Sequence, residues 1–325
     1  MTFVELPGYR IKYGKNRALT ILRIVSSIPK ILIRVKREKA WLERFVAREG
    51  VDLVISDNRY GLAIPGVFCV FITHQLLIRT PFGRFADRLL QRMNYRVIRT
   101  FSRCWVPDLP GRDALAGELS NPHRLPAIPV RYIGWLSRFG GGGKPVSMVA
   151  EAGAAAGMTA AGPELLVLLS GPEPQRTLLE KRVLQQAAGV GCRMVLVRGL
   201  PEGGVLSVPV PPAVTVYDHL PAAALERLIA GAELVVARTG YSTVMDLARM
   251  GKRAVLIPTP GQTEQEYLGR YLAGKGWAVC VSQKEFSLKD ILATGASRWP
   301  VEREGHRLRD EVLAVLAQSR PSALG

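Results

Sequence analysis

The stretch that decides the fold begins LVVARTGYSTVMDLA (Leu234–Ala248) and, after a Gly-Lys-Arg break, continues AVLIPTPGQTEQEY (Ala254–Tyr267). Its first four residues are an apolar run typical of a buried strand, and Gly240 permits a tight turn soon after them. Ser242 and Thr243 then offer hydroxyl groups where a helix begins. A second strand and a polar turn lead into a second helix. This alternation predicts an α/β fold built on a parallel sheet.

The start of the first of these helices is suited to bind an anion. Backbone N–H groups at a helix start have no partner within the helix, and the helix dipole adds positive potential there. Asp246 follows Ser242 by one helical turn, so its carboxylate could accept hydrogen bonds from the two hydroxyls of a ribose. The polar turn adds amides and carboxylates that suit sugar hydroxyls, namely Gln262, Glu264, Gln265 and Glu266.

Two motifs, Arg238–Ala248 and Pro258–Tyr267, together resemble the C-terminal domain of family 28 glycosyltransferases, the group that contains the bacterial MurG N-acetylglucosaminyltransferase. The resemblance implies an enzyme of the GT-B type, with two Rossmann-like domains. It extends from about Val51 to Ile291 and is weaker in the first half. The alternative is that Ser and Thr at a helix start are ordinary capping residues of a doubly wound sheet.

The length and composition are sufficient for two domains. The chain has 325 residues, of which 48% are hydrophobic. We expect a first domain of residues 1–137, a hinge and Gly/Ala-rich linker of 138–163, and a second domain of 164–325 whose final helix packs on the first. No apolar run approaches the ~18 residues of a membrane span. Four scattered cysteines argue against disulfides or structural zinc, so we expect a cytoplasmic protein. The expected enzyme uses no cofactor.

The start of the chain departs from the family. Family members open with a strand and a Gly-rich loop that ends in a histidine, whereas Phe3–Pro7 resembles the segment after those elements. We therefore expect a truncated N-terminal domain, with exposed strand edges and poor solubility. A start codon set too far downstream, a remnant, and a missing N-terminal segment supplied by a separate polypeptide are the alternatives.

The charge of the chain favours anionic partners. A formal net charge of +17 and a pI near 10.2 predict attraction to nucleic acid, anionic lipid or phosphorylated substrates. No nucleic-acid-binding motif accompanies the charge, and aromatic residues are only 7% of the chain, so we expect no nucleic-acid partner. Arginine bias in a GC-rich genome is another explanation of the excess.

Two basic segments lie in the first domain. Ile24–Phe45 mixes apolar residues with Lys and Arg, which is typical of a covering helix or of a helix on a membrane surface. Within Pro81–Arg103, arginines recur every three or four residues beside an apolar stripe that includes Phe85, Leu89 and Met93. We expect this second surface to meet an anionic membrane or a lipid-linked acceptor through Arg84, Arg88, Arg92 and Arg96. The alternative is a solvated helix face.

Polar residues follow the two strands predicted at Val51–Asp57 and Val67–Ile72. Because the carboxyl ends of parallel strands meet at one edge, we expect a shared acceptor-side rim that contains Asn58, Tyr60, His74 and Gln75. The family resemblance makes His74 a residue of the cleft and the candidate general base. A histidine at a strand end is as often a structural, hydrogen-bonded residue.

The resemblance also implies donor-binding residues in the second domain. Arg138 lies where the family has an arginine facing the donor phosphates, and Ser170-Gly171 where it has a glycine-rich phosphate turn, although Pro172 and Pro174 remove two backbone donors. Arg198 is a further candidate phosphate contact, and Tyr217 and His219 could flank a uracil. The remaining candidates come from the two motifs: Thr239, Gly240, Ser242, Thr243, Asp246, Gln262, Gln265 and Glu266.

Together these residues predict an inverting hexosyltransferase that uses a nucleotide sugar, preferably linked to UDP, and needs no metal because helix dipoles and arginines neutralise the leaving diphosphate. The acceptor is unknown, and a lipid-linked one would place the protein at the inner face of the membrane. Two alternatives remain. One is a nucleotide-sugar 2-epimerase. It would require several further carboxylates and histidines around the anomeric carbon, and the chain has only four histidines. The other is a non-catalytic or split-subunit protein that binds the nucleotide sugar.

Overall fold

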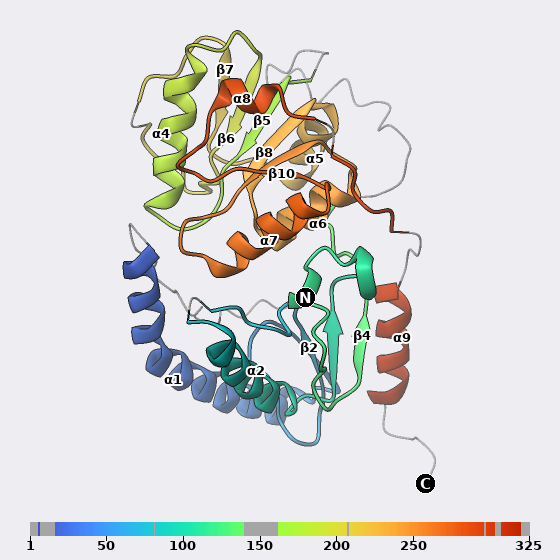
Figure 1. Cartoon of the computed structure of the whole chain (residues 1–325). Coiled ribbons are helices and arrows are strands. Elements are labelled where there is room, and N and C mark those ends of the chain that lie inside the picture. The colour runs from blue at the N-terminus through green and yellow to red at the C-terminus, as the bar shows by residue number, and fades with distance from the viewer. Residues whose placement is uncertain are drawn as a thin grey trace. The chain divides into compact units, whose positions relative to one another are not determined.

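The structure is a computed structural model that describes residues 6, 17–80, 82–139, 162–206, 208–295, 297–302 and 307–319, and of 17–28 and 307 it describes the backbone alone. The chain divides into two compact units (Figure 1). Unit 1 consists of Met1–Gly14, Ala18–Leu136 and Glu302–Gly325, and unit 2 of Lys15–Arg17 and Ser137–Val301. Residues 302–325 thus belong to unit 1, although the predicted boundary counted them with the second domain. Consistent with the expected packing of the final helix on the first domain, Val315 shares a core with Val70 and Trp105. Most of the predicted linker, 140–161, lies outside the described residues.

Unit 1 contains a parallel sheet with the strand order β1-β2-β3-β4. The strands are β1 (Leu53–Asp57), β2 (Phe68–Ile72), β3 (Arg103–Val106) and β4 (Val130–Tyr132). The helices are α1 (Arg17–Glu49), α2 (Arg84–Ile98), α9 (Arg307–Ser319) and the short 3-10 turns Gly111–Asp113 and Gly117–Leu119. Such a parallel sheet needs apolar cover on both faces.

Alternation along β2 supplies both faces of this sheet with apolar side chains. Cys69 and Phe71 point to one core, which Leu42 of α1 joins, while Val70 points to the other, which Val315 of α9 joins. A buried carboxylate of α1, Glu38, accepts hydrogen bonds from the Arg59 side chain and from the backbone N–H of Gly61. The predicted amphipathic segment Ile24–Phe45 is therefore a covering helix where its side chains are described.

Unit 2 contains a second parallel sheet, with the order β10-β9-β8-β5-β6-β7. Its strands are β5 (Leu165–Leu168), β6 (Met194–Val197), β7 (Val214–Tyr217), β8 (Leu234–Arg238), β9 (Ala254–Ile257) and β10 (Val279–Cys280). Its helices are α4 (Gln175–Ala187), α5 (Ala222–Gly231), α6 (Tyr241–Arg249), α7 (Thr263–Gly274) and α8 (Leu288–Leu292). The two parallel sheets with their helices confirm the predicted α/β class (Figure 1).

The strand order of unit 2 creates a crevice at β5. This strand pairs with β6 on one side and with β8 on the other, and the chain continues from β5 to β6 and β7 before it returns to β8. The connections that leave β5 and β8 therefore run to opposite sides. In open α/β sheets ligands bind at this type of switch point, outside the carboxyl ends of the strands.

None of the helices described in the structure is long and apolar enough to span a bilayer. The expected truncation of the first domain is based on Phe3–Pro7. Of these residues only Leu6 is described, so the expectation falls outside the described part of the chain.

A buried carboxylate organises the segment after β3. Asp108 is 0% exposed and accepts hydrogen bonds from the backbone N–H groups of Leu109, Leu115 and Ala116 at 2.8–2.9 Å and from the hydroxyl of Ser120 at 2.6 Å. Burial raises the pKa of Asp108, and these four donors oppose that effect. The carboxylate thus binds four hydrogen-bond donors of a segment whose only regular structure is two short 3-10 turns.

We expect Asp108→Asn to destabilise unit 1 by about 3 kcal/mol, because the new amide N–H₂ faces donors that had a charged acceptor. Chemical unfolding monitored by tryptophan fluorescence measures the change. Asp113→Asn, at an exposed position of the same segment, is the control and should alter the unfolding midpoint little. Equal effects of the two substitutions would refute the role given to Asp108.

Candidate functional site

Unit 2 contains a cavity of about 270 Å³ at the carboxyl ends of β5 and β6, next to the start of α6. Five of the predicted donor residues line it: Arg138, Ser170, His219, Thr243 and Asp246. They come from separate segments of the chain, and the cavity lies at the switch point of the sheet. The structure therefore brings these five predicted donor-binding residues together around one cavity.

The remaining lining is mostly apolar and was not predicted. Its aliphatic members are Leu168, Leu169, Val197, Leu220, Leu225, Ile229 and Leu247. Apolar walls with a few convergent polar groups are typical of small-molecule sites. The sequence offered no sign of this wall, because the same residues form ordinary strand ends and helix faces.

Helix α6 begins without a side-chain cap. Its N-cap residue is Gly240, which has no side chain, and the first helical hydrogen bond joins the N–H of Val244 to the carbonyl of Gly240. Ser242 and Thr243 belong to the first turn, whose N–H groups have no acceptor within a helix. Together with the helix dipole they form a partial positive charge at the cavity, which suits a phosphate. Thr243 lines the cavity, whereas Ser242 is exposed beside it.

Asp246 is held by the segment that enters unit 2. Its side chain is 4% exposed. One carboxylate oxygen accepts hydrogen bonds from the Ser137 hydroxyl at 2.7 Å and the Arg138 N–H at 3.3 Å, and the other accepts one from Arg138 Nε at 3.0 Å. The Arg138 side chain remains 57% exposed and lies over the Phe139 ring. A ligand hydroxyl that binds Asp246 in the predicted bidentate way must therefore displace Ser137 or Arg138.

Glycine is required at one wall of the cavity. Gly199 has φ +69°, and a Cβ at this position would lie 2.4 Å from the carbonyl oxygen of Leu169. Gly171, in the predicted phosphate turn, has φ +96° but does not line the cavity. The chain thus approaches itself closely where β5 and β6 end, and Ser170 is the residue of that turn at the cavity.

Arg198, a predicted phosphate contact, has a different role. All five of its N–H donors are engaged inside the protein, with both carboxylate oxygens of Glu180, with Asp218, and with the carbonyls of Gly204 and Val205. Its side chain is 2% exposed, and Glu180 is 1% exposed. The hydrogen bond to Glu180 raises the pKa of Arg198 further. No donor remains for a phosphate, so the prediction for this residue is corrected.

A second arginine, Arg238, is buried at the end of β8. Its guanidinium donates to the carbonyls of Gln175, Ile257 and Pro258 and pairs with no carboxylate among the described residues. Burial lowers its pKa to about 10. The next residue, Thr239, is 0% exposed and does not line the cavity, so its assignment to the donor-binding residues stays a prediction. Sequence reasoning missed the burial of Arg238, because an arginine after a strand usually suggests the surface.

Two side chains of α7 hold the polar turn that precedes the helix. Gln265 Oε1 accepts a hydrogen bond from the N–H of Thr259 at 2.8 Å, and Glu266 Oε1 accepts one from the N–H of Gly261 at 3.0 Å. Gln262 is the N-cap of α7. None of these three predicted sugar-binding side chains lines the cavity. Tyr217, the last residue of β7, also lies outside it.

In unit 1, three of the predicted acceptor-side residues lie at the carboxyl ends of β1 and β2. Asn58 has φ +53°, and its N–H donates to the carbonyl of Ile72. Asn58 Oδ1 accepts a hydrogen bond from the Thr73 hydroxyl at 3.3 Å, and that hydroxyl accepts one from the N–H of Gln75. His74, the candidate base, lies half-buried in the same turn.

The prediction for Tyr60 is corrected. Its ring packs in the core of unit 1 against Phe71, with a centroid distance of 5.1 Å. Burial raises the pKa of Tyr60 to about 12, and Cys104 adds to the shift. Tyr60 therefore follows β1 as a core residue and not as a residue of the polar rim.

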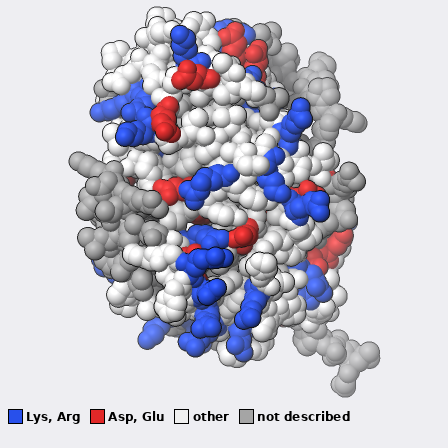
Figure 2. All heavy atoms as spheres, viewed as in Figure 1, with Lys and Arg blue, Asp and Glu red and all other residues white. Residues whose placement is uncertain are grey.

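The basic helix α2 exposes its apolar stripe. Phe82 precedes the helix and is 62% exposed, and Phe85, Leu89 and Met93 are 82%, 52% and 47% exposed. Figure 2 shows Lys and Arg side chains gathered over this helix. Of the predicted arginine stripe, Arg84, Arg88 and Arg92 line a cavity of unit 1, and Arg96 does not.

Among the described residues, no three His, Cys, Asp or Glu side chains are arranged to hold a metal ion.

Comparison with known proteins matches residues 213–297 to the glycosyltransferase family 28 C-terminal domain. A UDP-N-acetylglucosamine--N-acetylmuramyl-(pentapeptide) pyrophosphoryl-undecaprenol N-acetylglucosamine transferase of Desulforudis audaxviator is 34% identical over 99 residues, 30% of this chain and 26% of that protein. The match thus spans about a quarter of the length of this relative. His219, Thr243 and Asp246 lie within residues 213–297.

Solved structures share the fold. The glycosyltransferase of kitacinnamycin has a TM-score of 0.55 at 15% identity, over 92% of this chain and 76% of that one. The spinosyn rhamnosyltransferase SpnG in complex with thymidine diphosphate has a TM-score of 0.51 at 16% identity, over 89% and 70%. These similarities and the two parallel-sheet units confirm the predicted GT-B fold of two Rossmann-like domains.

We expect Arg198→Met to lower the stability of unit 2 by about 2–4 kcal/mol, because Glu180 would stay buried with one cation fewer. Urea unfolding measures the change. Arg193→Met removes a surface arginine that is 50% exposed, and should cost less than about 1 kcal/mol. A stable Arg198→Met variant with selectively weakened nucleotide binding would instead restore the phosphate-contact role.

Proposed function

We propose that this chain, a MurG-like member of glycosyltransferase family 28, transfers a hexose-type sugar from UDP to an acceptor hydroxyl with inversion at the anomeric carbon. One observation carries the proposal. The cavity of unit 2 joins an uncapped helix start, the Ser170 turn and the buried carboxylate of Asp246 at the switch point of a parallel sheet. A helix start suits a phosphate, and a carboxylate suits ribose hydroxyls.

The apolar wall of the cavity supports a nucleoside as the bound part of the donor. The cavity volume of about 270 Å³ is near the lower end for small-molecule sites, so it accommodates part of a nucleotide sugar. His219 at the rim offers a ring that could stack on a base, and the first turn of α6 would hold the diphosphate. Gln265 and Glu266 shape the neighbouring turn and would contact the sugar only after a change of their present hydrogen bonds.

Donor binding would rearrange the entry segment of unit 2. Asp246 already accepts three hydrogen bonds from Ser137 and Arg138. When ribose hydroxyls take over part of these, the half-exposed guanidinium of Arg138 becomes available to the donor phosphates. Because Asp246 is buried, the ribose hydroxyls would have to replace the hydrogen bonds that Arg138 gives up, so that the carboxylate keeps its donors.

The transfer itself needs a base and a stabilised leaving group. An acceptor hydroxyl attacks the anomeric carbon, the bond from that carbon to the β-phosphate oxygen breaks, and UDP leaves with the bonding electrons. His74 is the candidate that takes the hydroxyl proton. The α6 dipole and Arg138 would stabilise the negative charge on the diphosphate without a metal ion.

An acceptor at a membrane surface accounts for the exposed stripe of α2. Bulky apolar side chains exposed at 47–82% beside arginines are typical of helices that lie in an anionic membrane interface. The name of the Desulforudis audaxviator relative describes an acceptor linked to undecaprenol. We therefore propose a peripheral location on the cytoplasmic face of the membrane, with α2 as the contact.

Asp246→Ala should weaken the binding of UDP at least about tenfold, because a charge-assisted hydrogen bond to the ribose is lost. Isothermal titration calorimetry measures the affinity, and circular dichroism verifies folding. Ser137→Ala is the matched control: it removes a group that competes for the carboxylate, so UDP affinity should stay the same or rise. A folded Asp246→Ala variant with unchanged affinity and unchanged UDP release would refute the donor site.

Replacing Phe85 and Leu89 by serine should reduce sedimentation with vesicles that contain anionic phospholipid by about tenfold or more, because two apolar side chains no longer enter the interface. Leu313→Ser on α9 is the control, since Leu313 has a similar exposure of 56% in the same unit. If the control reduces sedimentation as strongly, or if the double variant sediments like the wild type, α2 is not the membrane contact.

A further inference from the structure

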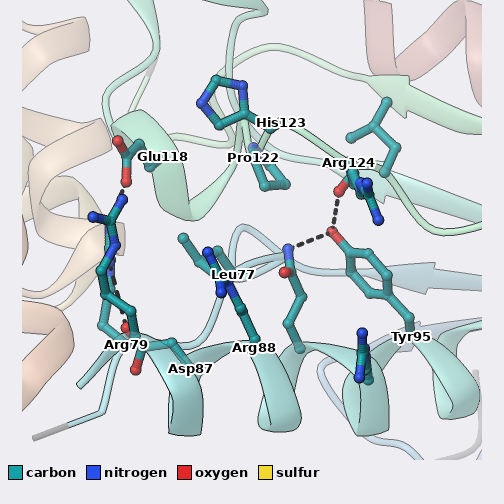
Figure 3. A pocket seen from close by; sticks show the side chains of 13 residues that line it. Leu77, Arg79, Asp87, Arg88, Tyr95, Glu118, Pro122, His123 and Arg124 are labelled. Atoms are coloured by element: carbon teal, nitrogen blue, oxygen red, sulfur yellow. Dashed lines mark hydrogen bonds and ion pairs between the residues drawn. The ribbon is translucent and has the colours of Figure 1, made fainter. Parts of the chain in front are cut away.

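Unit 1 has a cavity of its own, separate from the one in unit 2. Its volume is about 660 Å³, and it lies between one face of α2 and residues 118–125 (Figure 3). Figure 3 shows Arg88 and Tyr95 reaching from α2 toward the facing segment, which carries Glu118, Pro122 and His123. No residue is shared with the cavity of unit 2.

The cavity is strongly cationic. Five arginines and two acids line it, so three positive charges remain without counting His123. Both acids, Asp87 and Glu118, form ion pairs with the same arginine, Arg79. In the part of the chain that the structure describes, the other four arginines form no ion pair: Arg84, Arg88, Arg92 and Arg124.

The walls of the cavity are fixed at both ends. At one end, Arg79 bridges Asp87 of α2 and Glu118 of the facing segment. At the other, the Tyr95 hydroxyl donates to the backbone carbonyl of Arg124 at 2.5 Å and accepts a hydrogen bond from Gln91. A tyrosine hydroxyl is protonated at neutral pH, and burial raises the pKa of Tyr95 further, to about 12. The Arg79 ion pairs and the Tyr95 hydrogen bonds therefore hold the two walls of the cavity in place.

The spacing of the arginines on α2 favours the binding of an anion. Arg84, Arg88 and Arg92 follow one another at four-residue spacing, so they lie on one face of α2 and repel each other. The nearby acid Asp87 does not relieve this repulsion, because it is buried and accepts a hydrogen bond from the N–H of Thr80 as well as the ion pair. A concave site with an excess of positive charge concentrates anions.

The chemistry of the lining selects a phosphoryl group. Guanidinium groups bind phosphate oxygens in bidentate geometry, and several arginines around one site favour a multiply charged anion over a carboxylate. Leu77, Pro122 and Leu125 add an apolar wall beside the charges. We propose that this cavity is a binding site for a phosphate or diphosphate ester, with Arg88 and Arg92 on one wall and Arg124 on the other as its ligands.

The proposed site is separate from the donor site, but Arg88 and Arg92 lie on the same helix as the proposed membrane contact. Its residues belong to unit 1, and the stripe of Phe85, Leu89 and Met93 does not line the cavity. The phosphoryl group can belong to a soluble ester or to a phospholipid headgroup, and binding to vesicles distinguishes these sources.

The test uses the full-length chain and inorganic pyrophosphate as the probe, at constant ionic strength. Arg88→Gln combined with Arg92→Gln should weaken calorimetric binding at unit 1 at least about tenfold, because two charge-assisted contacts are lost. Hydrogen exchange with bound pyrophosphate should show protection in 84–95 and 118–125. This readout distinguishes the site from any binding of pyrophosphate in unit 2, and therefore from the success or failure of the donor proposal.

The control removes the same charge from the last turn of α2 and its C-cap residue. Arg96→Gln combined with Arg99→Gln leaves the cavity lining intact and should change the affinity less than about threefold. Should the Arg88/Arg92 variant fail to fold, Arg124→Gln tests the opposite wall. Equal losses in both pairs, protection only in unit 2, or the absence of binding to both pyrophosphate and anionic vesicles would overturn the proposal.

A second arm replaces pyrophosphate by phosphatidylcholine vesicles with and without phosphatidic acid. Binding of pyrophosphate that depends on Arg88 and Arg92 supports a soluble ester. If only the vesicles with phosphatidic acid bind in an Arg88- and Arg92-dependent way, the site holds a lipid headgroup. Both results support a phosphoryl site, whereas vesicle binding that is insensitive to these arginines and lost in the Arg96/Arg99 variant contradicts it.

Discussion

The pairing of β5 on both of its edges is the constraint on which unit 2 depends. Leu165, Leu166 and Val167 are 0% exposed, so this short strand cannot move without opening the core. Its hydrogen bonds to β6 and β8 fix where both neighbours end. The connections after β5 and β8 then diverge, and the space between them becomes the cavity. The position of the site is a result of strand order, and its chemistry comes from the few residues placed there.

Strand ends and glycines made much of this site predictable from the sequence. The apolar runs before Ser170 and Thr239 identify buried strands, and the carboxyl-end rule then places the residues after each strand at one edge of the sheet. That rule places Thr243 and Asp246 near this edge, whereas Arg138, Ser170 and His219 were expected there from the family resemblance; all five line the cavity. The α/β class and the two parallel sheets were predictable for the same reason, because β-branched runs alternate with helical segments.

Side-chain partners were not predictable in the same way, because they come from distant parts of the chain. Arg198 looks like a phosphate ligand at a strand end until α4 provides Glu180 beneath it. Tyr60 looks like a rim residue until Phe71 of the neighbouring strand packs on its ring. The arginines of α2 looked like one surface stripe, and only the distant segment 118–125 makes three of them part of a cavity. Periodicity assigns a residue to a helix face but does not say what lies opposite.

The hydrogen bond between Tyr95 and residue 124 has a consequence for how this protein can vary. Tyr95 bonds to the backbone carbonyl of residue 124 and not to its side chain. Every amino acid has such a carbonyl, so the frame of the cavity is indifferent to the residue at this position. Selection can therefore exchange the charge at residue 124 in a single step without loosening the fold. The ligand preference of this cavity can therefore change during evolution while the hydrogen bond that holds its walls is kept.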